Sequence, residues 1–146
     1  MNAWARCCSF IVVLLAVALP AAADEFRPAY LQLKQVDDTT YDVLWKLPAL
    51  DANTTLRLKP VFPEGTRQLT KPVGSFANNA TVLRWRVAVD GGLAGKAIDF
   101  PDLPGSRVDV LVRVERADGT EQLGRVLPVD PRFEVTASPG HLEVVK

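Results

Sequence analysis

Apolar and polar residues alternate along most of the chain from Tyr30 onward, in short runs separated by Pro, Gly, Asp and Asn. A period of two is typical of β-strands that bury one face. The pattern predicts strands at 29–34, 41–47, 55–59, 67–71, 81–89, 108–115, 122–127 and 133–135. Helical spacing is nearly absent, and the single helical turn that we expect lies at 92–96.

Turn residues separate these runs. Two aspartates at 36–39 predict a hairpin, because Asp tolerates turn geometry and accepts hydrogen bonds from its own backbone. The Asp-Gly pair within 117–120 is one of the strongest short-range hairpin signals. Pro60 and Pro63 predict a bend or a sheet edge, since proline donates no ladder hydrogen bond.

Many short strands with closely spaced turn signals predict an all-β fold. The abundance of Val supports sheet over helix, because β-branched side chains pack well on a pleated surface. We expect an antiparallel β-sandwich of seven to eight short strands, with Greek-key connections and an Ig-like architecture. A Greek-key barrel is the alternative.

The beginning of the chain is its most apolar part. Arg6 is followed by an uncharged stretch at 7–19 and then by Pro20 and three alanines at 21–23, which is the pattern of a cleavable signal peptide. The stretch is shorter than the roughly 20 residues that cross a bilayer, which favours cleavage after Ala23 over a retained anchor. We therefore expect a periplasmic or secreted protein whose mature chain does not insert into the membrane.

This signal divides the chain into three parts: a signal peptide at 1–23, a β-sandwich domain at 24–128 and a tail at 129–146. Both cysteines, Cys7 and Cys8, fall in the first part, so the mature domain would have no thiol and no disulfide. A lipid anchor is the alternative, but a lipoprotein cysteine follows the apolar stretch, whereas these two stand at its start.

Charge excludes several classes of partner. The chain has 17 basic and 17 acidic residues, and removal of Arg6 with the signal leaves 16 basic residues (17 − 1) against 17 acidic ones. A domain so close to neutrality is not expected to bind nucleic acid or anionic lipid through broad electrostatic attraction.

Catalytic chemistry is also poorly represented. The single histidine, His141, lies in the tail, which disfavours a catalytic triad or a zinc site. Two carboxylate pairs, Asp37 with Asp38 and Asp99 with Asp102, suit glycoside hydrolysis in principle, but both pairs lie in predicted loops. We therefore expect a protein that is not an enzyme and has no cofactor.

The run Arg84-Trp85-Arg86 combines an aromatic ring with two cations, a combination that can stack a base or a sugar. Strand alternation, however, places Trp85 on the opposite face from both arginines. We expect a core Trp with two outward arginines, and a stacking site is the alternative.

The mature amino terminus contains the only candidate metal ligands. A free α-amine beside Asp24 and Glu25 would offer hard ligands to a divalent cation, and weak binding of nickel or cobalt is the only metal interaction that we expect. A hydrated chain end without metal is the alternative.

Several short motifs, taken in order, resemble the extracytoplasmic amino-terminal domain of HupE/UreJ-family membrane proteins. The similarity extends over nearly the whole mature chain, and the motifs that carry it are DEFRPAYL at 24–31, YDVLWKLP at 41–48, GSF at 74–76, RWR at 84–86, GGLAGK at 91–96 and DVLVRV at 109–114. One departure is Asp24, where family members often have His.

The resemblance implies an exported β-domain that precedes transmembrane helices associated with nickel or cobalt uptake, and residues 142–146 resemble the approach to the first of these helices. It thus implies a non-enzymatic interaction or cation-presenting module with an envelope or membrane protein as partner. The alternative is a stand-alone secreted binding module for an envelope protein or a glycan, which an exposed aromatic patch would favour.

Overall fold

The computed structural model describes residues 27–49 and 57–139. The expected signal peptide at 1–23 and the candidate ligands Asp24 and Glu25 lie outside the described residues. Within the described residues the chain forms nine strands and one 3-10 helix: β1 (Ala29–Gln35), β2 (Thr40–Pro48), β3 (Thr66–Gln68), β4 (Val73–Ala77), β5 (Ala80–Val89), β6 (Ala97–Asp99), η1 (Leu103–Gly105), β7 (Val110–Glu115), β8 (Glu121–Val126) and β9 (Arg132–Glu134).

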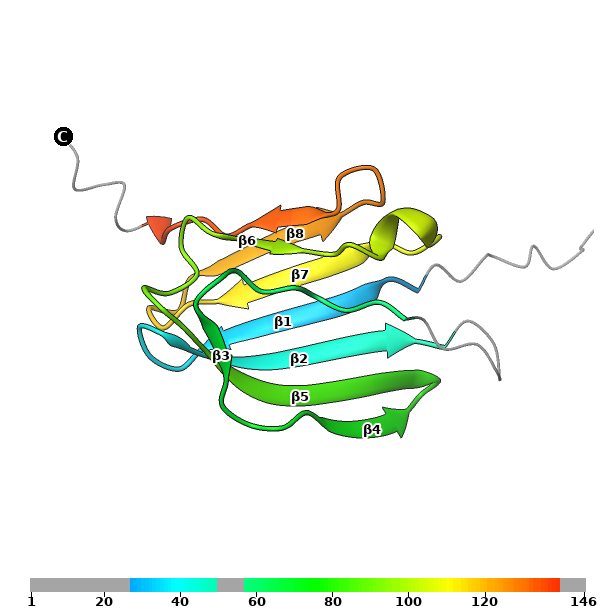
Figure 1. Ribbon diagram of the computed structural model, residues 1–146, viewed down its shortest axis with the longest axis horizontal. Coiled ribbons are helices and arrows are strands. Elements are labelled where there is room, and N and C mark those ends of the chain that lie inside the picture. Colours follow the sequence, from blue (N-terminus) through cyan, green and yellow to red (C-terminus); the bar gives the residue numbers. More distant parts are fainter. Residues whose placement is uncertain (1–26, 50–56, 140–146) are drawn as a thin grey trace, which may run out of the picture.

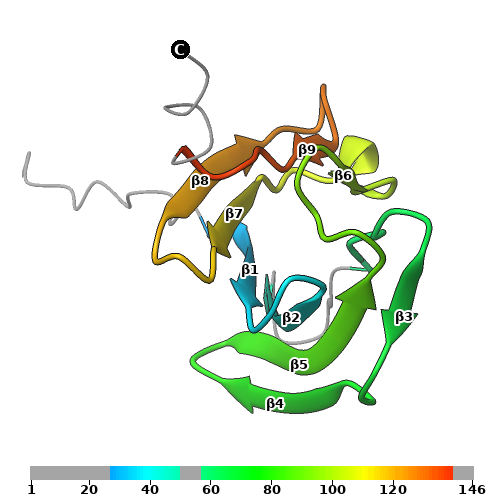
Figure 2. The same ribbon diagram turned by 90° about the vertical axis from the view of Figure 1, so that its left-hand side faces the viewer.

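Seven strands form one large sheet in the order β3-β5-β2-β1-β7-β8, and β4 follows β3 along the same edge of β5 (Figure 1). The other two strands, β6 and β9, pair separately. Viewed along the strands, the large sheet curves, and β6 and β9 lie on its concave side near β7 and β8 (Figure 2). The expected all-β, sandwich-like fold is confirmed.

The sheet is mixed, whereas an antiparallel sheet was expected. All named strand pairs are antiparallel except β1 and β7, which run parallel from Ala29 opposite Val110. A parallel pair needs a crossover connection, and the segment from β5 to β7, with β6 and η1, provides it. Alternation in a sequence indicates a strand but not its direction, so this pairing was not predicted.

The core lies against the concave face, where the alternating residues predicted to be apolar are buried. Trp45 of β2 is 1% exposed, and its ring lies 5.9 Å from that of Phe100, centroid to centroid. The indole Nε1 of Trp45 donates a hydrogen bond of 3.1 Å to the carbonyl oxygen of Leu58. The amide of Leu93 donates one of 2.9 Å to the hydroxyl of Tyr41. The aromatic residues of β2 thus connect the sheet to the segments that cover it.

Both predicted hairpins are present. The amides of Thr39 and Thr40 donate to the Asp37 carboxylate in the β1–β2 connection. Gly119, at φ 86°, closes the β7–β8 connection. Segment 91–96 forms turns rather than a helical turn, and the described part of the expected strand at 55–59 is not in a strand.

The packed domain extends beyond residue 128, where sequence composition placed its end. Phe133 and Val135 are buried in the core, and β9 pairs with β6. Phe133 packs against Gly124 of β8, where an added Cβ would lie 2.4 Å from the Cε2 atom of its ring. Residues 132–135 therefore belong to the domain, because β8 leaves space for them.

Polar side chains also hold the segment after β9. The guanidinium of Arg116 donates hydrogen bonds to the carbonyl oxygen and the hydroxyl of Thr136, at 3.1 and 3.0 Å. The hydroxyls of Ser138 and Thr120 both donate to the carboxylate of Asp118. These bonds, with that of Ser138 contributing most, lower the pKa of Asp118 to about 2.

We expect Gly124→Ala to lower the free energy of unfolding by about 1–3 kcal/mol, because the new methyl group overlaps the Phe133 ring. Gly105→Ala is the matched control: its Cβ meets no atom within 4 Å, so its effect should be below about 0.5 kcal/mol. Urea denaturation measures both. Equal effects would contradict the assigned packing of β9 on β8.

We expect the carboxyl carbon of Asp118 to titrate with a midpoint near 2 in an NMR pH series, and Ser138→Ala to move the midpoint up toward the ordinary value of 3.8. Because the folded-state pKa is lowered, the stabilisation is complete above the unfolded value and is lost as the pH falls through the folded one. Unfolding of wild type and Asp118→Asn at pH 5 and pH 2 should therefore differ more at pH 5. A midpoint near 3.8 in the wild type would contradict the network.

Candidate functional site

The convex face of the large sheet carries the side chains that alternate with the core residues of the three central strands. We call this surface the outer face, and it consists of Tyr30, Gln32, Lys34, Asp42, Leu44, Lys46, Val82, Arg84 and Arg86. All nine side chains are exposed or half-buried. The surface is therefore accessible within the described part of the molecule.

The pairing register arranges these nine residues as a square grid with Leu44 at its centre. Gln32 of β1 and Arg84 of β5 lie directly opposite Leu44 on its two sides. Along β2, Asp42 and Lys46 precede and follow it. Directly opposed residues in a sheet have Cβ atoms about 4.5–5.5 Å apart, so the side chains of Gln32 and Arg84 lie beside Leu44.

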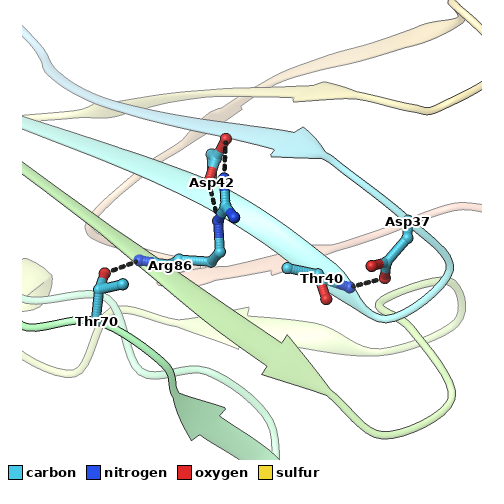
Figure 3. A network of polar contacts seen from close by, with 5 residues as sticks. All are labelled: Asp37, Thr40, Asp42, Thr70 and Arg86. Carbon is cyan, nitrogen blue, oxygen red and sulfur yellow. Dashed lines mark hydrogen bonds and ion pairs between the residues drawn. The ribbon is translucent and has the colours of Figure 1, made fainter.

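One cation of the grid is neutralised by a neighbour. Arg86 holds Asp42 with two hydrogen bonds, from Nε to Oδ1 at 2.6 Å and from the terminal nitrogen to Oδ2 at 3.3 Å (Figure 3). The carboxylate raises the pKa of the Arg86 guanidinium above its ordinary value. The backbone amide of Arg86 donates to the Thr70 hydroxyl at 2.8 Å, which fixes β5 to the edge of the sheet.

The other three cations of the grid are not held in ion pairs, although Lys34 lies across from Asp42 of β2 and Glu115 of β7. Among residues 27–49 and 57–139, no carboxylate forms an ion pair with Lys34, Lys46 or Arg84. All three side chains are exposed. Gln32, Leu44 and two of these cations, Lys34 and Arg84, help to line an open depression at the centre of the face.

Strand β7, beside β1, carries no such excess of charge. Arg113 of β7 pairs with Glu121 at 2.5 Å and with Glu115 at 3.2 Å. Hydrogen bonds to Glu121 and Tyr30 raise its pKa. The positive charge that is not held in ion pairs on this side of the sheet therefore lies over β1, β2 and β5, with Arg67 of β3, opposite Ala88, at its margin.

The arrangement suits binding better than catalysis. It offers three mobile cations, one amide and an apolar centre, and these groups can hold carboxylate or phosphate oxygens against a flat surface. A shallow, open surface does not enclose a small substrate in the way that a binding pocket does.

The predicted orientation of the 84–86 run is confirmed. Arg84 and Arg86 are exposed on the outer face, whereas Trp85 packs against the core, with its ring edge-on to Phe62 at 6.5 Å. The alternative of a ring stacked between two cations therefore does not apply. Asp37, one of the aspartates considered for catalysis, accepts the amides of Thr39 and Thr40, which helps to lower its pKa.

Lys34, Lys46 and Leu44 were not identified from the sequence. Their signal is alternation within each strand, which indicates only that they point outward. Their juxtaposition depends on the registers between β1, β2 and β5, and a single sequence does not specify these.

Within the described residues, no group of three or more His, Cys, Asp or Glu side chains is placed to hold a metal ion. No helix in the same part of the chain has the length and apolar character needed to cross a membrane.

Comparison with known proteins does not identify a family: no protein-family model matches the chain, and no curated protein matches it either.

Proposed function

We propose that this chain is an exported, non-enzymatic binding domain, and that its outer face docks onto an acidic region of an envelope or membrane protein. The observation that carries the proposal is the set of three cations without ion pairs, Lys34, Lys46 and Arg84, around the apolar Leu44. An apolar centre with charges around it is the usual anatomy of a protein interface.

The charge pattern also indicates what kind of complex to expect. Exposed ion pairs contribute about 0.2–1 kcal/mol each, so three of them add about 0.6–3 kcal/mol, which is less than millimolar affinity requires and decreases with salt. Their main effect is to accelerate encounter and to orient the partner. Such a complex suits a domain held near its partner in one compartment.

A glycan ligand is less well supported. Among the described residues Phe76 is the most exposed aromatic side chain, at 67%, and it lies on β4; the outer face has one aromatic ring, the half-buried Tyr30. Sugar binding through stacking needs an aromatic platform, so the alternative of a glycan-binding module lacks its expected feature.

The resemblance to HupE/UreJ-family domains supports a location beside a membrane transporter of nickel or cobalt. In this proposal the outer face holds the domain against the transporter or another envelope protein, and Asp24 and Glu25 present a cation. Only the sequence supports the presentation of a cation by Asp24 and Glu25, since these two residues lie outside those described.

We expect the double variant Lys34→Glu/Arg84→Glu to bind poly-glutamate, a probe for acidic protein surfaces, about tenfold more weakly than wild type in fluorescence anisotropy at low salt. Lys59→Glu/Arg107→Glu is the matched control: it makes the same charge change at exposed sites that lie outside the strands of the outer face. Equal weakening by both variants would show that net charge alone governs binding, which would contradict the proposed docking surface.

We expect the exported chain to begin at Asp24 in mass spectrometry and to bind NiCl₂ or CoCl₂ with a dissociation constant of about 1 mM in isothermal titration. Asp24→Asn/Glu25→Gln should abolish this heat, because it removes both carboxylate ligands. Absence of binding at millimolar metal would remove the cation-presenting part and leave the docking surface untouched.

A further inference from the structure

Strand β4 forms an accessible edge of the large sheet. Within the described residues it pairs with β5 alone. All five of its residues are exposed, and Val73 and Phe76 retain 71% and 67% of their surface. The strand contains no charge, although charged residues are a common protection of sheet edges.

The β4–β5 turn determines which backbone groups face outward. Asn78 and Asn79 have positive φ angles of 52° and 56°, the conformation of a two-residue type I′ hairpin. Ala77 and Ala80 flank this turn and pair with each other, so they share its closing hydrogen bonds. Hydrogen-bonded and non-hydrogen-bonded positions alternate along an antiparallel pair. Because Ala77 directs its N–H and C=O groups toward β5, Phe76 and, two residues earlier, Gly74 direct theirs to the free edge.

These two positions make β4 complementary to itself. If two copies of β4 pair antiparallel about Ser75, Gly74 of each copy lies opposite Phe76 of the other. Both residues have outward backbone groups, so each of the two pairs forms two hydrogen bonds. Ser75 then faces Ser75 of the second copy at the central position, which is not hydrogen-bonded.

Side-chain packing supports this register. Gly74 and Phe76 lie on the same face of β4, and Gly74 has no side chain to cover Leu83, whose Cδ2 atom would lie 3.2 Å from a Cβ at that position. An aromatic ring across from a strand glycine fills such a space. Phe76 of the second copy would thus cover Gly74 and approach Leu83.

Electrostatics do not oppose the pairing. In the register about Ser75, Val73 lies opposite Ala77, and Lys71, the nearest charged residue before the strand, lies opposite Asn79. No two like charges face each other, although like charges directly opposite destabilise a pair of strands.

The length of the interface is limited by an interruption between β3 and β4. Leu69 and Thr70 both bond to Arg86 and Val73 pairs with Arg84, so residues 71 and 72 interrupt the pairing opposite Trp85. Pro72 lies in this interruption. A contact confined to five residues per copy is smaller than the interface of a stable dimer, so the association is expected to be weak.

We propose that two copies of this chain associate through β4, antiparallel about Ser75, so that their large sheets join into one continuous sheet. The pairing is independent of the docking role of the outer face, which lies on other strands.

Disulfide trapping tests the register. Cys7 and Cys8 are first replaced by Ser, so that Ser75→Cys introduces the sole thiol. In the proposed register the Cα atoms of the two residues at position 75 lie about 4.5 Å apart, which suits a disulfide. With oxidised glutathione as oxidant, we expect Ser75→Cys to form at least about fivefold more linked dimer than Val73→Cys. Val73 is exposed like Ser75, but in this register it lies opposite Ala77 of the second copy. Val73 of that copy is four residues further along the strand.

Equal linking by the two variants, or preferential linking of Val73→Cys, would overturn the antiparallel register. Sedimentation velocity tests the association itself without a covalent bond. Phe76→Lys should raise the dimer dissociation constant at least about tenfold. Val129→Lys, at an apolar residue that is 89% exposed and lies off β4, should leave it unchanged. A chain that stays monomeric at millimolar concentration would overturn the proposal and leave β4 to a strand of another protein.

Discussion

The burial of Trp45 is the interaction on which the rest of this structure depends. Its ring lies between the large sheet and the segments that cover it, in contact with Phe100 and hydrogen-bonded to Leu58. With Trp45 directed inward, the pleat of β2 turns Leu44 and Lys46 outward. The same packing that closes the core therefore also creates the candidate site, and a change of register in β2 would disrupt both.

The sequence was sufficient to predict the strands that bury one face. In β1, β2 and β7 the apolar residues alternate and the corresponding side chains are buried, whereas in β5 Val87 and Val89 are buried and Leu83 and Trp85 are half-buried. β4 was not predicted, because none of its residues is buried and it contains Gly and Ser where a pattern would need apolar side chains. β6 was also not predicted from the sequence. The direction of β7 depends on a crossover that alternation does not encode.

The candidate site was predictable only in part. Alternation placed Arg84 and Arg86 outward, as observed, but it did not indicate that Asp42 neutralises Arg86 and leaves Arg84 free. The distinction between the two arginines depends on the register of β2 with β5, which brings Asp42 and Arg86 together although they lie 44 residues apart in the sequence. The signal peptide, the amino-terminal ligands and the resemblance to a transporter family remain predictions, because each depends on residues or relationships beyond the described domain.

The parallel pairing of β1 with β7 has a consequence for how the chain acquires its structure. β1 is the first of the described strands and yet lies inside the sheet, between β2 and a strand roughly 80 residues downstream. The hairpin of β1 and β2 can form early from neighbouring residues, but one long side of β1 stays unpaired until β7 arrives. The nascent domain thus passes through a stage in which an interior strand is a temporary edge, and during that stage it is most vulnerable to pairing with the wrong strand.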